Sequence, residues 1–217
     1  MSLAFLSPVG EAVARSPMEG MAKAAGARFA VIDGWNLAVE YPGEEGGRER
    51  VGFADVSHLR KWEVQGERVG GELRTARREG EAWVCPLTPT RALIIEDGLG
   101  RNYGHTEVSS QLPESDGGRA GAVDVTTCFA ALAIFGPYAR EVIARFCAID
   151  LRSQVSPPHR FRPGSIARQP GMILVEAPDR FLLLFGWAIG EYMWNVVADA
   201  AAHLGGAPIG LGALNDA

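Results

Sequence analysis

The chain has 217 residues, of which 47% are apolar and 22% charged, and its formal net charge is −5. This composition is ordinary for one sizeable globular domain or two small ones, and it argues against a largely disordered chain. A net acidic chain gives no electrostatic reason to expect nucleic acid or an anionic membrane as a partner.

The compartment is predicted from what the sequence lacks. No apolar run approaches the roughly 18 residues of a membrane-spanning helix, and the longest candidate, residues 172–197, is interrupted by four charged side chains. The first residues show no basic stretch followed by an apolar core, so no secretory signal is expected. Three cysteines without C-x-x-C spacing, Cys85, Cys128 and Cys147, are typical of reduced thiols. We therefore expect a cytoplasmic protein.

The N-terminal elements open with a segment of uncertain type. Residues 1–27 are rich in Ala, Gly, Met and Ser without a clear period, which indicates a leader or a short helix. Apolar runs at 29–32 and 35–39 then flank Asp33-Gly34. That dipeptide predicts a tight hairpin, because a type I′ turn needs positive φ at both central residues.

Three more strands and a boundary follow. One strand is predicted at 53–64, and two shorter ones at 83–85 and 92–95, with prolines between them. Together with the hairpin they form a first α+β half over residues 28–97. Residues 98–121 are dominated by Gly, Ser, Asn, Asp and Pro, and they predict a linker loop.

The second half, residues 122–217, has a clearer pattern. Its predicted elements are a central strand at 125–135, a helix opened by Gly136-Pro137, a strand hairpin at 172–175 and 181–185, and a helix at 189–204. This β-α-β-β-α order is typical of a split βαβ, ferredoxin-like unit that lacks its last strand.

A short internal echo links the two halves. Asp55-Val-Ser57 leads into one predicted strand, and Asp124-Val-Thr126 leads into another. Both strands are followed by a glycine, Gly66 and Gly136 respectively. The echo suggests that both halves use one local design.

No complete catalytic or metal site is predicted from the residue patterns. The histidines are far apart and never at i,i+4 spacing, so no zinc site is expected; they are His58, His105, His159 and His203. No phosphate-binding glycine loop and no G-x-S-x-G elbow occurs. The acidic pair Glu96-Asp97 is interpreted as turn chemistry, and Trp187 and Trp194 as core or interface anchors.

Several motifs in order resemble the aminomethyltransferase (glycine cleavage T-protein) family of folate-binding proteins. The first is Asp55-Val-Ser-His58, which is similar to that family's Asp-Val-Ser-His-Met stretch. The others are Asp124-Val-Thr126, the run 130–134, the run 136–142, Arg180-Phe-Leu-Leu-Leu184, Tyr192-Met-Trp194 and the run 208–214. The second half most resembles the gamma subunit of heterotetrameric sarcosine oxidase, through Ser156-Pro-Pro158, Ala167-Arg168 and Asp179-Arg-Phe181.

The resemblance implies an α+β fold of two ferredoxin-like halves of the folate-binding-domain type, without the family's C-terminal barrel. It also implies tetrahydrofolate as the candidate ligand, no metal, and flavin only in a partner subunit. The folate-binding candidates are Asp55, Leu59, Arg168, Glu176 and Trp187.

The sequence departs from the family where folate chemistry is carried out. The family's Gly-Gly-x-x-Asp-Asp segment has an aspartate at the reacting end of the folate, but the comparable stretch 80–85 has none. Its Thr-Gly-Glu-Asp-Gly segment, whose glutamate holds the pterin, is shortened to residues 175–180, where Glu176 is the remaining substitute. The barrel is not expected, since the sequence ends at Ala217.

These departures favour an auxiliary, non-catalytic protein of one-carbon or amine metabolism that packs against larger sarcosine or amine oxidase subunits, or forms a homo-oligomer. One alternative is a minimal tetrahydrofolate-dependent aminomethyltransferase using Asp55, Glu176 and Arg168. The other is a folate-binding regulatory module without turnover.

Overall fold

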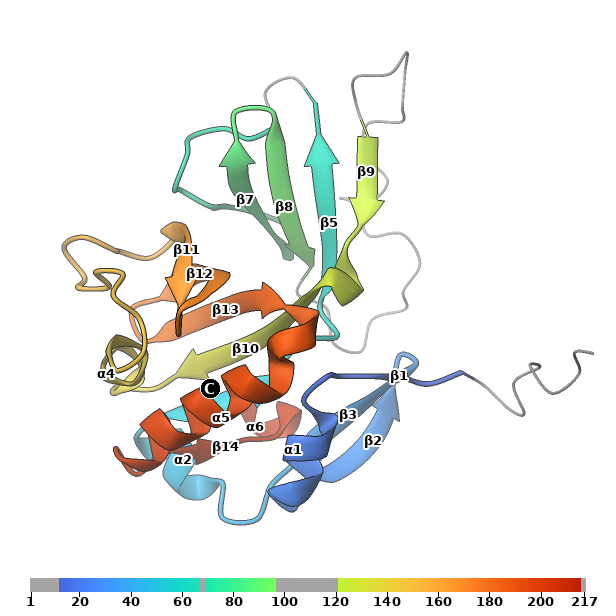
Figure 1. Ribbon diagram of the computed structural model, residues 1–217, viewed down its shortest axis with the longest axis vertical. Coiled ribbons are helices and arrows are strands. Elements are labelled where there is room, and N and C mark those ends of the chain that lie inside the picture. The colour runs from blue at the N-terminus through green and yellow to red at the C-terminus, as the bar shows by residue number, and fades with distance from the viewer. Residues whose placement is uncertain (1–11, 67–68, 97–120, 216–217) are drawn as a thin grey trace, which may run out of the picture.

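The structure, a computed structural model, describes residues 12–66, 69–96 and 121–215, which form three β-sheets and several short helices (Figure 1). The strands of the largest, here called the central sheet, are β4 (Gly52–Asp55), β10 (Phe129–Phe135), β11 (Phe161–Ile166), β12 (Gln169–Ala177), β13 (Arg180–Gly186) and β14 (Ala207–Pro208). Their order is β11-β12-β13-β10-β4-β14. Neighbours are antiparallel except β14, which runs parallel to β4.

Two smaller sheets accompany the central one. The outer sheet contains β5 (Arg60–Gln65), β6 (Arg77–Glu79), β7 (Ala82–Thr88), β8 (Arg91–Glu96) and β9 (Gly121–Asp124). Its order is β6-β7-β8-β5-β9, and all its pairs are antiparallel. The N-terminal sheet has the order β1-β3-β2 and contains β1 (Ala14–Arg15), β2 (Arg28–Ile32) and β3 (Trp35–Glu40).

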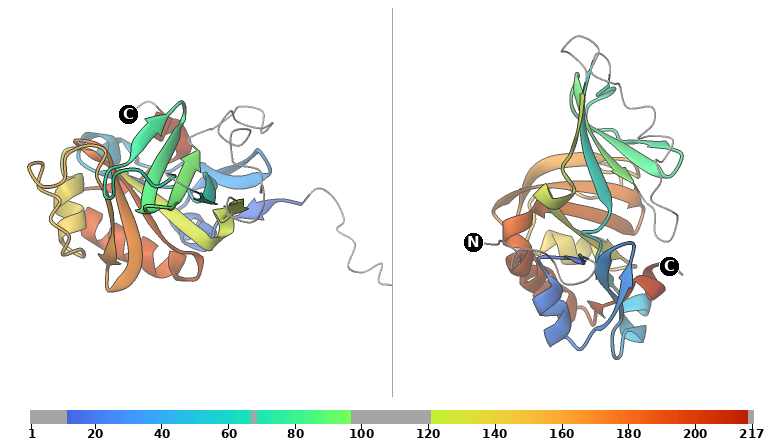
Figure 2. Two further views of the ribbon diagram at one scale, coloured as in Figure 1. Left: turned by 90° about the horizontal axis from the view of Figure 1, so that it is seen from above. Right: turned by 90° about the vertical axis from the view of Figure 1, so that its right-hand side faces the viewer.

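The central sheet is buried on both faces. The helices are α1 (Glu19–Ala24), α2 (Glu45–Glu49), α4 (Ala139–Ala144), α5 (Gly190–Ala202) and α6 (Leu211–Asn215). Residues of α1, α4 and α5 pack on one face, and residues of the outer sheet, β3 and α6 pack on the other. In Figure 2 the outer sheet stands on the side of the central sheet away from α5. A strand covered on both faces needs apolar residues throughout, which explains the unbroken Ala, Leu, Ile and Phe run of β10.

The predicted tight turns are confirmed. Asp33 and Gly34 have φ of 51° and 77°, and they join β2 to β3 as the type I′ reading requires. The second predicted hairpin is β12–β13. Helix α5 is followed by Gly205 at φ 73°, the left-handed conformation that commonly ends a helix.

The prediction of one strand at 53–64 is wrong. Strands β4 and β5 lie there instead, in two different sheets, with a turn between them. The turn forms because the Asp55 carboxylate accepts the backbone N–H of Ser57 at 3.0 Å, which diverts the chain from extended pairing. Likewise, the strand predicted at 125–135 begins only at Phe129, after a 3₁₀ turn (Thr126–Cys128).

The β-α-β-β-α order of the second half is present as β10, α4, β12, β13 and α5. The edge beside β10, where the last strand of a split βαβ unit would pair, is occupied by β4 from the first half. The first half is not a second ferredoxin-like unit in the described residues, because its strands are distributed over all three sheets. Strand β4 pairs only with strands of the second half, β10 and β14, whereas β5 pairs with β8 of the first half and with β9 of the second.

The predicted leader and linker lie partly outside the described residues. Residues 1–11 of the predicted leader and residues 98–120 of the predicted linker lie outside the described residues. The rest of the leader contains β1 and α1, and the linker's last residue, Gly121, begins β9.

Candidate functional site

Two neighbouring segments carry the chain between the central and outer sheets. One runs from β4 to β5 through residues 56–59, and the other runs from β9 to β10 through residues 125–128. They are tied together by backbone hydrogen bonds, because Val56 donates to Ala131 at 3.0 Å and Val125 donates to Lys61 at 2.9 Å. We call this region the crossover.

The internal echo in the sequence is a repeated turn at the crossover. The backbone N–H of Ser57 donates to Oδ1 of Asp55 at 3.0 Å, and that of Thr126 donates to Oδ1 of Asp124 at 2.8 Å. The two turns also meet, since the Lys61 N–H donates to Oγ1 of Thr126 at 3.0 Å. An aspartate that bonds the amide two residues on is a standard way to turn a chain. The repeated motif therefore has a structural reason.

Asp55 is the most constrained carboxylate of the crossover. It accepts the hydroxyl of Ser57 at 2.7 Å in addition to the backbone amide. Desolvation raises the pKa of Asp55 above its ordinary value, and hydrogen bonds from Ser16 and Ser57 oppose that rise. These bonds hold the carboxylate in the turn.

Lys61 is fully buried beside these turns. Its Nζ donates to the carbonyl oxygens of Ser57 at 2.9 Å and Leu59 at 2.8 Å. Burial lowers the pKa of Lys61 to about 7, and the negative charges of Asp55 and Asp124 limit the fall. The amine is therefore close to its own midpoint at neutral pH.

His58 is also enclosed, with 1% of its surface exposed. Within the described residues neither ring nitrogen has a hydrogen-bond partner. Burial, helped by the positive charge of Lys61, lowers the pKa of His58 to about 3, so the ring is neutral. Ser57, His58 and Lys61 are all buried, so these polar groups of the crossover are shielded from solvent.

The five folate-binding candidates lie on different elements of the fold. Asp55 and Leu59 lie at the crossover, and Trp187 follows β13 with its ring centroid 6.2 Å from that of Trp35. Arg168 lies in the turn between β11 and β12 and is exposed. Glu176 lies towards the far end of β12, where it forms an ion pair with Arg180 at 3.2 Å.

Strand register explains the separation of the two carboxylates. Asp55 is opposite Leu132, whose side chain packs on the helix-covered face of the central sheet. Glu176 is the extra residue of a bulge in β12, and its charge acts on Cys85, which lies in the core on the other face. Asp55 and Glu176 therefore lie on opposite faces of the central sheet.

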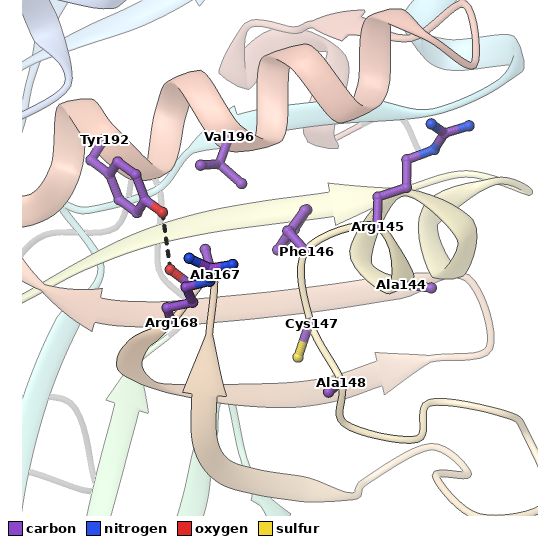
Figure 3. Close-up of a pocket in the computed structure, with 9 residues that line it drawn as sticks. All are labelled: Ala144, Arg145, Phe146, Cys147, Ala148, Ala167, Arg168, Tyr192 and Val196. Carbon is purple, nitrogen blue, oxygen red and sulfur yellow. Dashed lines mark hydrogen bonds between the residues drawn. The ribbon is translucent and has the colours of Figure 1, made fainter.

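A pocket of about 490 Å³ lies elsewhere, between α4, α5 and the β11–β12 turn (Figure 3). Its lining residues are Ala144, Arg145, Phe146, Cys147, Ala148, Ala167, Arg168, Tyr192 and Val196. Arg168 is the one folate-binding candidate among them. No sequence pattern predicts that residues 144–148 and Arg168 lie close together, because only tertiary packing brings them together.

The described residues offer no metal site and no membrane span. Among them, no group of three or more His, Cys, Asp or Glu side chains could hold a metal ion. No helix in these ranges is long and apolar enough to cross a membrane.

Comparison with known proteins gives related sequences of one kind. No family model matches the chain. The aminomethyltransferase of Parafrankia sp. (strain EAN1pec) is 27% identical over 92% of this chain and 61% of its own length. That of Frankia alni is 26% identical with the same two shares, and that of Picosynechococcus sp. is 30% identical over 38% of this chain and 24% of its own. The chain thus spans at most about three fifths of these relatives.

Solved structures share the fold. A chain of the heterotetrameric sarcosine oxidase from Corynebacterium sp. U-96 in complex with pyrrole 2-carboxylate aligns with a TM-score of 0.64 and 17% identity, over 89% of this chain and 97% of that one. The glycine cleavage system aminomethyltransferase T from Bartonella henselae aligns with a TM-score of 0.70 and 15% identity, over 93% and 60%. The chain is therefore similar in sequence to aminomethyltransferases, and it shares its fold with an aminomethyltransferase and with a chain of a heterotetrameric sarcosine oxidase.

Proposed function

We propose that the chain is an auxiliary, non-catalytic subunit of an amine-oxidising assembly, whose flavin and folate are held by larger subunits. The observation that carries this proposal is the separation of Asp55 and Glu176 on the two faces of the central sheet. A pterin needs its amino-pyrimidine edge paired when it is buried, and an unpaired edge forfeits affinity. The crossover adds support, because the Asp55 carboxylate and the Lys61 amine are both engaged in hydrogen bonds within the turn.

The likeness to sarcosine oxidase supports the same proposal at the level of the fold. That alignment covers most of both chains, and the protein it belongs to is a heterotetramer. In such a role, this fold would pack against the larger subunits.

A tetrahydrofolate-dependent aminomethyltransferase is the second candidate. The observation that favours it is that the curated relatives compared above are all aminomethyltransferases. In that case Asp55, Arg168 and Glu176 would contribute to binding or turnover. Folate binding without turnover would instead indicate a regulatory module.

Calorimetric titration of the purified full chain with tetrahydrofolate separates these candidates. The auxiliary role predicts no saturable binding up to about 1 mM, a concentration at which about 4 kcal/mol of affinity would be visible. Micromolar binding together with turnover of methylene-tetrahydrofolate would overturn it in favour of the transferase. Binding that is lost in Glu176→Gln, but kept in the exposed control Glu79→Gln, would locate the pterin at Glu176.

A second measurement addresses the partner. The chain is co-expressed with flavin-dependent amine oxidase subunits from the same genome, and the mass of the purified species is measured by light scattering. The auxiliary role predicts a stoichiometric complex that contains the chain and the flavin. A chain that purifies alone in every such combination contradicts it.

A further inference from the structure

The pocket between α4, α5 and the β11–β12 turn combines positive charge with an apolar lining. Arg145 and Arg168 contribute its two charges, and no carboxylate is among the lining residues. The rest of the lining is apolar or aromatic apart from the Tyr192 hydroxyl and the Cys147 thiol. Its volume of about 490 Å³ is in the range of small-molecule sites.

The two arginines have no partner of their own. Among the described residues, no hydrogen bond or ion pair involves either guanidinium, and both side chains are exposed. Most other surface arginines with nearby acids are paired, as Arg152 is with Asp150 at 2.6 Å. A guanidinium presents several donors in a rigid fork, which suits the oxygens of a carboxylate or a phosphate.

The turn that carries Arg168 has an unusual backbone. Ala167 and Arg168 have φ of 48° and 63°, the left-handed region that glycine and asparagine adopt at lower cost. A two-residue hairpin of this kind normally prefers Asn-Gly. Arg168 therefore places a positively charged side chain at a position where glycine would have less backbone strain.

Contacts from both neighbouring helical segments hold this turn in its conformation. The Ala167 N–H donates to the carbonyl of Phe146, after α4, at 2.9 Å. The Tyr192 hydroxyl, from α5, donates to the carbonyl of Ala167 at 3.0 Å (Figure 3). Strain that the surroundings enforce in this way is typical of ligand sites.

The thiol in the pocket is not a nucleophile. Cys147 is 7% exposed, and its Sγ contacts the carbonyl of Ser165 at 3.5 Å. Burial raises the pKa of Cys147, which keeps it protonated. The pocket is therefore equipped for binding and carries no covalent chemistry.

We propose that this pocket binds a small amphipathic anion, a carboxylate or phosphate attached to an apolar body. The charged end pairs with Arg168, while the apolar body packs on Phe146 and Val196 beside the Tyr192 ring. Arg145, whose guanidinium points away from Arg168 in Figure 3, adds a second positive charge to the lining. This site is separate from the crossover and does not depend on the auxiliary role proposed above.

Phenyl phosphate is the first probe, titrated into the full chain by calorimetry and by amide NMR. We expect saturable binding in the millimolar range or tighter, with shifts at Phe146, Cys147 and Ala167. Benzoate should bind in the same place. Inorganic phosphate should bind at least about tenfold more weakly, since it lacks the apolar body. Benzyl alcohol, which lacks the charge, should give no saturable binding.

Variants test the charged end. Arg168→Asn keeps a residue suited to the left-handed turn but removes the cation, so we expect affinity for phenyl phosphate to fall at least about tenfold while the melting temperature is kept or raised. Arg145→Gln should weaken binding without affecting the fold. Arg28→Gln, an exposed arginine on β2, is the matched control and should bind normally.

Two results would overturn the proposal. One is no saturable binding of phenyl phosphate or benzoate up to about 10 mM, where even about 3 kcal/mol of affinity would be measurable. The other is equal binding by wild type, Arg168→Asn and Arg145→Gln. Tetrahydrofolate binding that survives both substitutions would count against the auxiliary role and leave this proposal untouched.

Discussion

Lys61 is a buried lysine whose amine stabilises the turn after Asp55. It has no exposed surface, and its Nζ bonds two carbonyls of the segment that follows Asp55. Removing an ammonium from water is costly, so the folded protein holds this proton less tightly than an unfolded chain does. The lysine ties the crossover together and makes stability depend on pH.

The first prediction concerns that pH dependence. The pKa of Lys61 is about 7 in the folded state against 10.5 for an ordinary lysine, so between these values the unfolded chain binds one more proton. The free energy of unfolding should then rise with pH in this window by up to about 1.4 kcal/mol per unit. In Lys61→Met that contribution should vanish. Urea unfolding of both proteins at pH 7, 8 and 9 measures the difference in slope.

Lys23→Met is the matched control, because the Lys23 side chain is 53% exposed on α1. Its slope should equal that of wild type. Equal slopes for wild type and Lys61→Met would show that Lys61 keeps an ordinary pKa in the folded protein.

At the scale of elements, the two crossover turns share one geometry in two environments. Both aspartates accept the amide two residues on, but Asp55 also binds the Ser57 hydroxyl, whereas Asp124 is exposed. The two turns should therefore contribute differently to the free energy of unfolding. Each contribution depends on how many buried donors lose their acceptor when the carboxylate is removed.

The second prediction follows from this comparison. Asp55→Ala should lower the free energy of unfolding by about 2 kcal/mol or more, because it leaves buried donors of Ser57 unsatisfied. Asp124→Ala should cost less than about 1 kcal/mol, since water can replace an exposed acceptor. Denaturant unfolding at neutral pH measures both. If Asp124→Ala lowered the free energy of unfolding as much as Asp55→Ala does, the stabilisation would come from the turn geometry and not from the burial of its donors.

Local signals in the sequence predicted the local elements well. Asp33-Gly34 fixes its own hairpin, and the stripe of Ala139, Val142 and Ile143 marks the buried side of α4, because neighbours in sequence determine both. The break at Asp55 was missed, since an apolar run on either side of it looks like one strand. Which sheet each piece joins depends on partners far along the chain.

The candidate site was predicted less completely than the fold. A resemblance gives the order of residues, but the face on which a side chain lies depends on register. Glu176 illustrates this, because it is the extra residue of a bulge that no local pattern announced. Arg168 is the one pocket residue that was predicted as a site residue, since most of the others come from α5, the end of α4 and the segment after it.

At the scale of the whole molecule, the central sheet separates two apolar cores. Cys147 lies in the core on the helix side, and Cys85 lies in the core on the side of the outer sheet. Both thiols are buried and burial raises the pKa of each, whereas Cys128 is exposed. The three cysteines therefore report separately on the surface and on each core.

The third prediction uses this arrangement. In the native protein a thiol reagent should label Cys128 quickly and the other two slowly. In Cys128→Ser, Cys147 should then react faster than Cys85, because Cys147 lines the pocket and is 7% exposed, whereas Cys85 has no exposed surface and reacts only when its core opens. Mass spectrometry of the labelled peptides at successive times measures the two rates. A much faster reaction at Cys85 would show that the outer sheet opens on its own.

The pairing of β4 with β10 also affects how the protein folds during its synthesis on the ribosome. The ribosome makes β4 and β5 before β10, which pairs with β4, and before β9, which pairs with the edge of β5 that β8 leaves open. Contacts between residues so distant along the chain are slow to form, since the intervening segment must first be confined. The nascent first half is thus left with unsatisfied strand edges during synthesis, and these edges are natural points for a chaperone to hold until the second half arrives.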